Sequence, residues 1–83
     1  MNSKKITGQQ IRMARVALKW RVDDLSKYSE LPWARLQKFE RTNDFLPNDA
    51  KTDKLINLFE KNNIIFENED QGYKPYIKIK DEQ

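Results

Sequence analysis

The chain contains neither cysteine nor histidine. Without cysteine it has no disulfide framework and no thiolate nucleophile, a composition that fits a reducing compartment. Without histidine it lacks a common zinc ligand and the side chain that most often transfers protons near neutral pH. Glycine accounts for two of the 83 residues, so no glycine-rich loop is present to cradle a phosphate. We therefore expect no metal, no cofactor and no enzymatic activity.

Long apolar runs are missing as well. No run approaches the length of a membrane span or of a signal-peptide core. We therefore expect a soluble, cytoplasmic protein without a membrane partner. The 83 residues suffice for one domain with a small core, and 35% of them are charged. A chain this short and polar often gains stability by forming oligomers.

The net charge of +3 is distributed unevenly along the chain. Residues 1–41 hold ten basic and four acidic residues, a balance of +6, whereas residues 42–83 hold six basic and nine acidic residues, a balance of −3. A basic half joined to an acidic half indicates that the basic half meets a polyanion such as DNA. The alternative is an ordinary solvated surface.

Helical periodicity and turn residues predict four helices. They are expected over about residues 7–20, 22–29, 32–41 and 50–62. Thr7 and Gln10 fit a capping box at the start of the first helix. Pro32 suits the first turn of the third helix, where its missing N–H is not needed. The short second and third helices, joined by a tight turn, have the pattern of a helix-turn-helix.

Beyond residue 63 the periodicity changes from helical to alternating. Ile64 to Phe66 is β-branched and aromatic, and Tyr76 to Lys80 alternates apolar and basic residues, so both segments are typical of strands. The polar segment between them predicts an antiparallel hairpin. We therefore predict a mainly α fold with helices in residues 1–63 and a C-terminal β-hairpin in residues 64–83, forming one compact domain.

These segments resemble the XRE-type, or phage-repressor-like, helix-turn-helix transcriptional regulators. The resemblance is closest to a small subgroup with a C-terminal hairpin. It is carried by ITGQQIRMAR, by DDLS at 23–26, by LQKFE at 36–40, and by IIFEN with YIKI at 64–68 and 76–79. It implies a four-helix repressor-like fold and a bacterial or phage regulator that binds double-stranded DNA sequence-specifically. It also implies a homodimer on a near-palindromic operator, with the recognition helix, about 32–41, in the major groove.

The resemblance and the side-chain chemistry suggest roles for individual residues. The side chains expected at the bases are Trp33, Ala34, Arg35 and Gln37. The side chains expected at phosphates are Arg12, Arg21, Lys38, Arg41 and Asn43. Arg15 and Glu40 occupy positions that resemble the family's internal ion pair, which orients the recognition helix. The alternative for Trp33 is that it folds back onto the second helix or anchors a protein partner.

Three residues depart from the family pattern. Val22 stands where the family has a Gln that supports a base contact and holds a phosphate. Glu30 replaces the glycine of the turn, so the turn either contains a left-handed residue at a cost of about 1 kcal/mol or has another shape. Pro32 replaces a small polar capping residue. The missing Gln at position 22 and the Pro32 start lend some weight to a second hypothesis, a helix-turn-helix adaptor that binds another regulator rather than DNA.

The hairpin is the predicted dimerisation element. A two-stranded sheet leaves unpaired edges, which invite pairing with another chain. Twofold pairing across one edge would set two recognition helices about 34 Å apart, one turn of DNA. The residues expected at this interface are Ile64, Ile65, Phe66, Tyr76, Ile77 and Ile79. The alternative is that the hairpin covers the first and fourth helices within one subunit.

Overall fold

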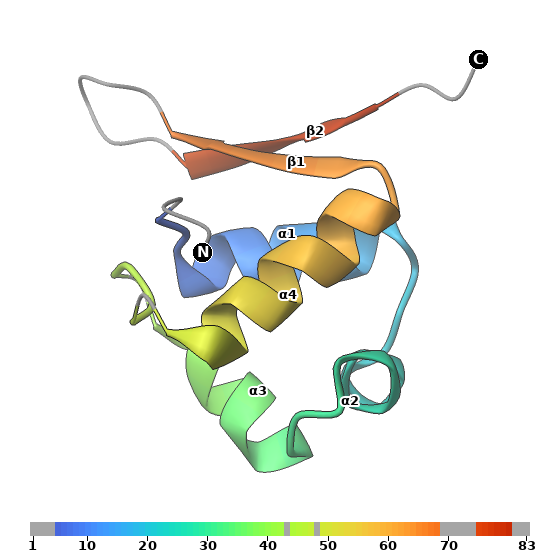
Figure 1. The fold of residues 1–83 in the computed structure, drawn as a ribbon, viewed down its shortest axis with the longest axis vertical. Helices are drawn as coiled ribbons and strands as arrows, with labels where there is room; N and C mark the ends of the chain where they lie inside the picture. Colours follow the sequence, from blue (N-terminus) through green and yellow to red (C-terminus); the bar gives the residue numbers. More distant parts are fainter. Residues whose placement is uncertain (1–4, 43, 48, 69–74, 81–83) are drawn as a thin grey trace.

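The described part of the chain forms four helices and one antiparallel hairpin (Figure 1). The computed structural model describes residues 5–42, 44–47, 49–68 and 75–80, and the side chains of 68, 75 and 76 lie outside this description. The elements in chain order are α1 (Gly8–Ala17), α2 (Val22–Ser29), α3 (Trp33–Glu40), α4 (Ala50–Lys61), β1 (Ile64–Asn68) and β2 (Pro75–Ile79). The predicted mainly α fold with a C-terminal β-hairpin is confirmed.

The helix bounds differ from the prediction at four ends, one of which is the end of α3 at Glu40, one residue before the expected Arg41. α1 ends at Ala17 because Lys19 takes a left-handed conformation with φ of 59°, and Trp20 therefore lies in the connection to α2. Pro32 is the N-cap of α3 rather than a residue of its first turn, since its ψ of 140° is extended. α4 ends at Lys61, one residue earlier than expected.

The predicted capping box at the start of α1 is present. The Thr7 backbone N–H donates to Gln10 Oε1 at 2.9 Å, and the Gln10 backbone N–H donates to Thr7 Oγ1 at 3.2 Å. Gln10 Nε2 also donates to the backbone oxygen of Glu67 at 2.8 Å. One buried glutamine thus satisfies the start of α1 and ties this helix to β1.

One apolar core joins all six elements. Phe59 of α4 is fully buried at its centre, and its ring lies 5.7 Å from that of Phe66 in β1 and 5.9 Å from that of Trp20. The Trp20 ring lies 4.8 Å from that of Tyr28 in α2. This row of rings links the hairpin to α2 through α4. Trp20 thus has the core-capping place expected for an aromatic residue at the end of the first helix.

The hairpin lies across α1 and α4, with β1 in contact with α4 and β2 in contact with α1 (Figure 1). Its register pairs Ile64 with Ile79 and Phe66 with Ile77. Ile64 and Phe66 are buried in the core of the chain itself. The prediction that these two residues face a second subunit is therefore corrected, because at 0% and 3% exposure they have almost no surface left for a partner. Within one subunit the hairpin packs on α1 and α4.

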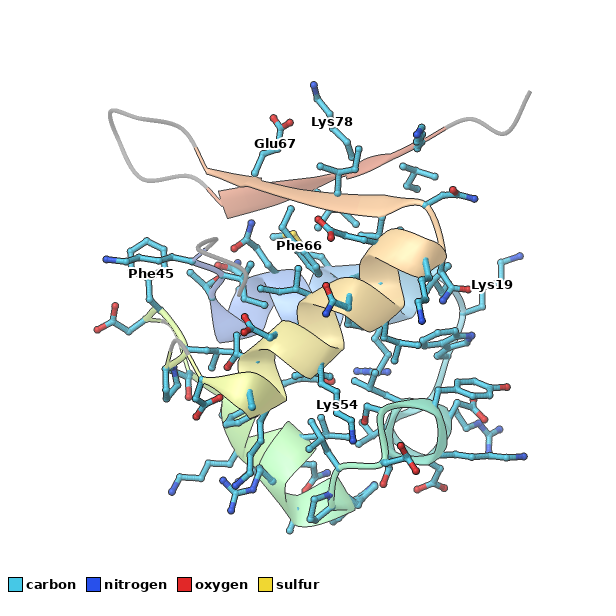
Figure 2. The ribbon with its side chains drawn as sticks, viewed as in Figure 1. Lys19, Phe45, Lys54, Phe66, Glu67 and Lys78 are labelled. Carbon is cyan, nitrogen blue, oxygen red and sulfur yellow. The ribbon has the colours of Figure 1, made fainter. Side chains whose placement is uncertain are left out.

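The other residues predicted at a dimer interface keep some exposure. Ile65 and Ile77 are half-buried, and Ile79 is 64% exposed. The Tyr76 side chain lies outside the described residues. Glu67 and Lys78 point away from the helices and pair at 3.6 Å, whereas Phe66 points toward α1 and α4 (Figure 2).

The turn between α2 and α3 contains a left-handed residue that is not glycine. Glu30 has φ of 61° and ψ of 26°, so the first of the two shapes considered for this turn is the one adopted. Ser26 Oγ donates to the backbone oxygen of Leu31 at 2.6 Å, and Ser29 Oγ accepts from the Leu31 N–H at 3.3 Å. These two hydroxyls hold the turn in shape against a conformational cost of about 1 kcal/mol.

Gly8 lets the start of α1 touch the end of α3. A Cβ at this position would lie 1.8 Å from the backbone oxygen of Phe39 and 2.5 Å from that of Thr42. Both distances are far below van der Waals contact, and both atoms belong to backbone that cannot swing away. The contact therefore requires glycine at position 8.

Gly8→Ala is expected to lower the free energy of unfolding by about 3 kcal/mol, because the methyl group must push two helices apart. In an unconstrained helix the same change would stabilise by up to about 1 kcal/mol, so the sign is informative. Urea denaturation measures the difference. The matched control is Gln9→Ala at the exposed neighbouring position, which should stay within about 0.5 kcal/mol of wild type. A Gly8→Ala variant as stable as wild type would contradict the close approach.

Candidate nucleic-acid interface

α3 presents one continuous ridge to the solvent. Leu36 and Phe39 turn into the core. Residues three and four apart share a helix face, so the ridge directed away from these two consists of Ala34, Gln37, Lys38 and Arg41. Ala34, Lys38 and Arg41 are exposed and Gln37 is half-buried.

Trp33 lies at the N-terminal tip of the same helix. It keeps 47% of its surface exposed, so it is not absorbed into the core by folding back onto α2. The residues on either side of it, Pro32 and Ala34, are exposed as well. The tip of α3 is therefore apolar and open to solvent.

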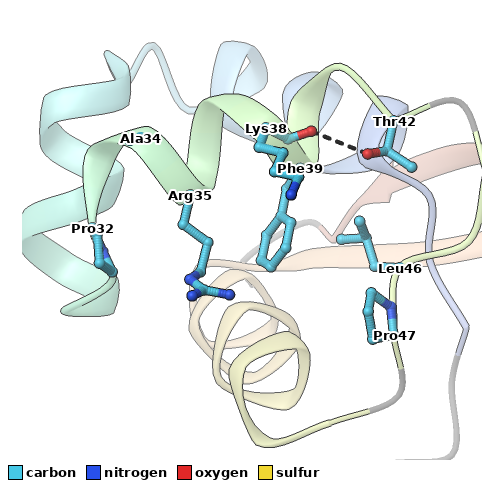
Figure 3. Close-up of a pocket in the computed structure, with 8 residues that line it drawn as sticks. All are labelled: Pro32, Ala34, Arg35, Lys38, Phe39, Thr42, Leu46 and Pro47. Atoms are coloured by element: carbon cyan, nitrogen blue, oxygen red, sulfur yellow. Dashed lines mark hydrogen bonds between the residues drawn. The ribbon is translucent and has the colours of Figure 1, made fainter.

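A groove of about 550 Å³ runs along one flank of α3 (Figure 3). Its lining residues are Pro32, Ala34, Arg35, Lys38, Phe39, Thr42, Leu46 and Pro47. Arg35 and Lys38 supply its two cations, and Phe39, Leu46 and Pro47 supply apolar surface. Thr42 Oγ1 donates to the backbone oxygen of Lys38 at 3.0 Å and so closes the end of α3 beside the groove.

A smaller groove, of about 200 Å³, lies along the other flank, between α3 and the pair α1 and α2. Its lining residues are Arg12, Arg15, Val22, Gln37, Glu40 and Arg41. Arg12 of α1 thus meets Gln37 and Arg41 of α3, although they are far apart in the sequence. Val22 contributes apolar surface to this groove.

Arg15 and Glu40, which were expected to pair, lie in direct contact inside this second groove. Arg15 Nε and Nη2 donate to the two carboxylate oxygens of Glu40 at 2.7 and 3.0 Å. Arg15 Nη1 donates to the backbone oxygen of Trp20 at 2.9 Å. The side chains of the pair are 16% and 9% exposed, so α1, the segment after it and α3 are joined at one shielded point.

The ion pair favours the charged form of the Arg15 guanidinium. The hydrogen bond with Glu40 raises the pKa of the Arg15 guanidinium, burial opposes this rise, and the attraction of the Glu40 charge adds to it. A raised pKa means that the stabilisation is complete below the ordinary arginine pKa and is lost only as pH rises beyond the folded-state value. Arg15 therefore stays cationic across the neutral range.

The remaining basic residues of this face keep their charges available. Within the described residues, Arg12, Arg35, Lys38 and Arg41 form no ion pair with an acid. Arg21 is exposed at the N-cap of α2, where its backbone N–H donates to Asp24 Oδ2 at 2.9 Å.

The structure divides the predicted site residues between the two flanks of α3, a division that the sequence did not predict. Arg35 and Gln37 were both predicted at the bases, but they line different flanks of α3. Asn43, predicted at a phosphate, lies outside the described residues. Leu46 and Pro47 line the larger groove and were read from the sequence only as a loop. The sequence signal for this contact was the Leu-Pro pair itself, because proline ends regular structure and both side chains are apolar.

Two kinds of site are not found. Among the residues described, no group of three metal-ligating side chains is arranged to hold a metal ion. None of the described helices has the length and apolar character needed to cross a membrane.

Comparison with known proteins adds no assignment. No protein-family model matches the chain, and no curated protein or solved structure matches it either.

Replacing one partner of the ion pair should destabilise the fold strongly, because the other charge is left shielded and unpaired. We expect Arg15→Met or Glu40→Met to lower the free energy of unfolding by about 3 kcal/mol each. The double variant should lose clearly less than the sum of the two. A urea denaturation cycle measures this coupling.

The exposed pair between Lys78 and Glu67 provides the matched control, since its partners are 61% and 34% exposed. Its coupling energy in the same cycle should stay below about 1 kcal/mol. Additive losses at Arg15 and Glu40 would show that the two side chains do not stabilise the fold as a pair.

Proposed function

We propose that α2, the turn after it and α3 form a helix-turn-helix, and that this chain is an XRE-type transcriptional regulator that binds double-stranded DNA. The observation that carries the proposal is the distribution of cations around α3. The outward ridge itself carries Lys38 and Arg41, and it is flanked by Arg12 of α1 on one side and by Arg35 on the other.

This distribution complements a DNA major groove. The groove is about 12 Å wide, which admits one α-helix, and a phosphate backbone runs along each of its two walls. With the α3 ridge directed at the base edges, the cations of each flank meet one backbone. Phosphate contacts of this kind fix position and orientation, while residues of the ridge and tip are left to read bases.

The ion pair supports the same proposal. α3 is only eight residues long, so it cannot hold its own orientation. Arg15 and Glu40 clamp its C-terminal end to α1. Arg12 lies one helical turn from Arg15 on α1, so the clamp also sets the distance between a flanking cation and the ridge.

A second candidate function is that of a protein-interaction adaptor. The half-exposed Trp33 favours it, because exposed tryptophans are frequent anchors of protein interfaces. Val22, without a polar group for DNA, favours it too. The two candidates differ in electrostatics: an adaptor has no reason to bind DNA with a steep salt dependence.

DNA binding should weaken steeply with salt. If a dimer neutralises roughly four to eight phosphates, the logarithm of the affinity should fall against the logarithm of the salt concentration with a slope of about −4 to −7. A titration of mixed genomic fragments at several salt concentrations, followed by fluorescence anisotropy, gives this slope. A flat response would exclude DNA and leave the adaptor.

Single charge variants locate the binding face. Arg35→Ala or Lys38→Ala removes one cation per subunit, so the slope should become shallower by about 2 for a dimer. Lys61→Ala is the matched control, because this lysine is exposed at the end of α4 and away from α3. If the control changed the slope as much as the α3 variants, the binding face would lie elsewhere.

We further propose that the regulator is a homodimer on a near-palindromic site, paired through an edge of the hairpin. Ile79, 64% exposed at the end of β2, has the most uncovered apolar surface among those predicted interface residues whose side chains the structure describes. Ile79→Lys should therefore yield a folded monomer with weak DNA binding, measured by sedimentation equilibrium. Removing residues 64–83 would not test this, because Ile64 and Phe66 belong to the core.

Tyr28→Lys is the control for this variant. Tyr28 is a half-exposed aromatic residue on α2, at the end of the molecule away from the hairpin (Figure 1). It should leave the dimer intact. A dimer that persists in Ile79→Lys would move the interface from the hairpin to the helices.

A further inference from the structure

The N-terminal tip of α3 is apolar, although the face around it is basic. Pro32, Trp33 and Ala34 are consecutive and exposed. Pro32 is the N-cap, makes no side-chain capping hydrogen bond and has no N–H of its own. Leaving nearly half of a tryptophan in water forgoes a large gain from burial. This surface is therefore suited to contact an apolar group on a ligand.

The polar side chains of α3 are directed elsewhere. Arg35 extends into the larger groove, on the opposite side of it from Leu46 and Pro47 (Figure 3). Gln37 lies one turn further along the helix, half-buried in the smaller groove. The tip keeps one polar side-chain group, the indole N–H of Trp33, which can only donate.

Thymine is the base that offers an apolar group in the major groove. Its C5-methyl lies on the groove floor, whereas the other base edges present hydrogen-bond donors and acceptors. Apolar side chains recognise this methyl by contact rather than by hydrogen bonding. The first residues of a recognition helix are the ones that reach base edges.

We infer that Trp33 and Ala34 recognise thymine methyl groups in the bound DNA, an inference that rests on the proposed DNA-binding function. The cations on the two flanks of α3 hold the phosphates and bring the tip to the groove floor. Trp33 covers one methyl with its ring, and Ala34 makes a smaller contact with a neighbouring one. Specificity at these positions thus depends on burial of apolar surface.

The test uses a duplex selected from random DNA by the wild-type protein, prepared in matched versions. One series of duplexes carries uracil in place of a single thymine, a different thymine in each duplex, which removes only the methyl group. Wherever that methyl is contacted, the protein should bind the duplex about fourfold more weakly, the equivalent of one buried methyl group. In another pair, C·G or 5-methylcytosine·G replaces T·A, and the methylated version should bind more tightly.

Protein variants assign the effect to the tip. At the thymine that Trp33 contacts, the Trp33→Ala variant should bind the thymine and uracil duplexes equally. Its salt slope should remain that of wild type. The matched control is Tyr28→Ala, which removes an aromatic residue of similar exposure from α2. It should preserve the full preference for thymine. Thermal unfolding followed by circular dichroism verifies that both variants are folded.

The outcomes separate this inference from the function on which it rests. Salt-dependent DNA binding by wild type with equal affinity for the thymine and uracil duplexes overturns methyl recognition and leaves DNA binding standing. A thymine preference that survives in Trp33→Ala overturns the role of Trp33 and assigns this side chain to a protein partner. No salt-dependent binding to any duplex overturns the proposed function itself.

Discussion

A single guanidinium group ties the C-terminal end of α3 to two other segments of the fold. Arg15 donates to both oxygens of Glu40 and to the backbone oxygen of Trp20, so it joins α1, the connection to α2 and α3 at one point. A planar donor fork fixes angles as well as distances. Beside it, Gly8 brings the α1 backbone against the last turn of α3. The C-terminal end of α3 is thus fixed by two independent contacts, one electrostatic and one steric.

The N-terminal end of α3 is held in a different way. The turn before it depends on the hydroxyls of Ser26 and Ser29 and on a left-handed Glu30. A non-glycine residue in this left-handed conformation makes the turn less stable than glycine at the same position would. α3 is therefore anchored firmly at the end near the core and more weakly at its apolar tip. On the proposed function, the weaker end is the one that meets the bases.

Local and periodic features could be predicted from the sequence, and features of packing could not. The capping box of Thr7 and Gln10 and the bounds of α2 depend on neighbouring residues and were predicted. The approach of Gly8 to Phe39 depends on two distant segments, and no local pattern encodes it. The apolar strand β1 could have faced a partner or its own helices, and alternation alone does not distinguish these. Burial of Phe66 against Phe59 decided it.

Two of the three departures from the pattern of the proposed family have the same physical effect. Val22 and Pro32 put apolar groups where that family usually has hydrogen-bonding side chains, whereas Glu30 takes the left-handed conformation of the turn. On the proposed function, Pro32 and Trp33 leave few polar groups at the tip of α3, and Val22 adds apolar surface beside Gln37 in the smaller groove. A helix of this kind can still gain affinity from the cations on its flanks, because phosphate contacts do not depend on base sequence. Its discrimination between bases must then come mainly from apolar contact and from the polar groups one turn further along the ridge.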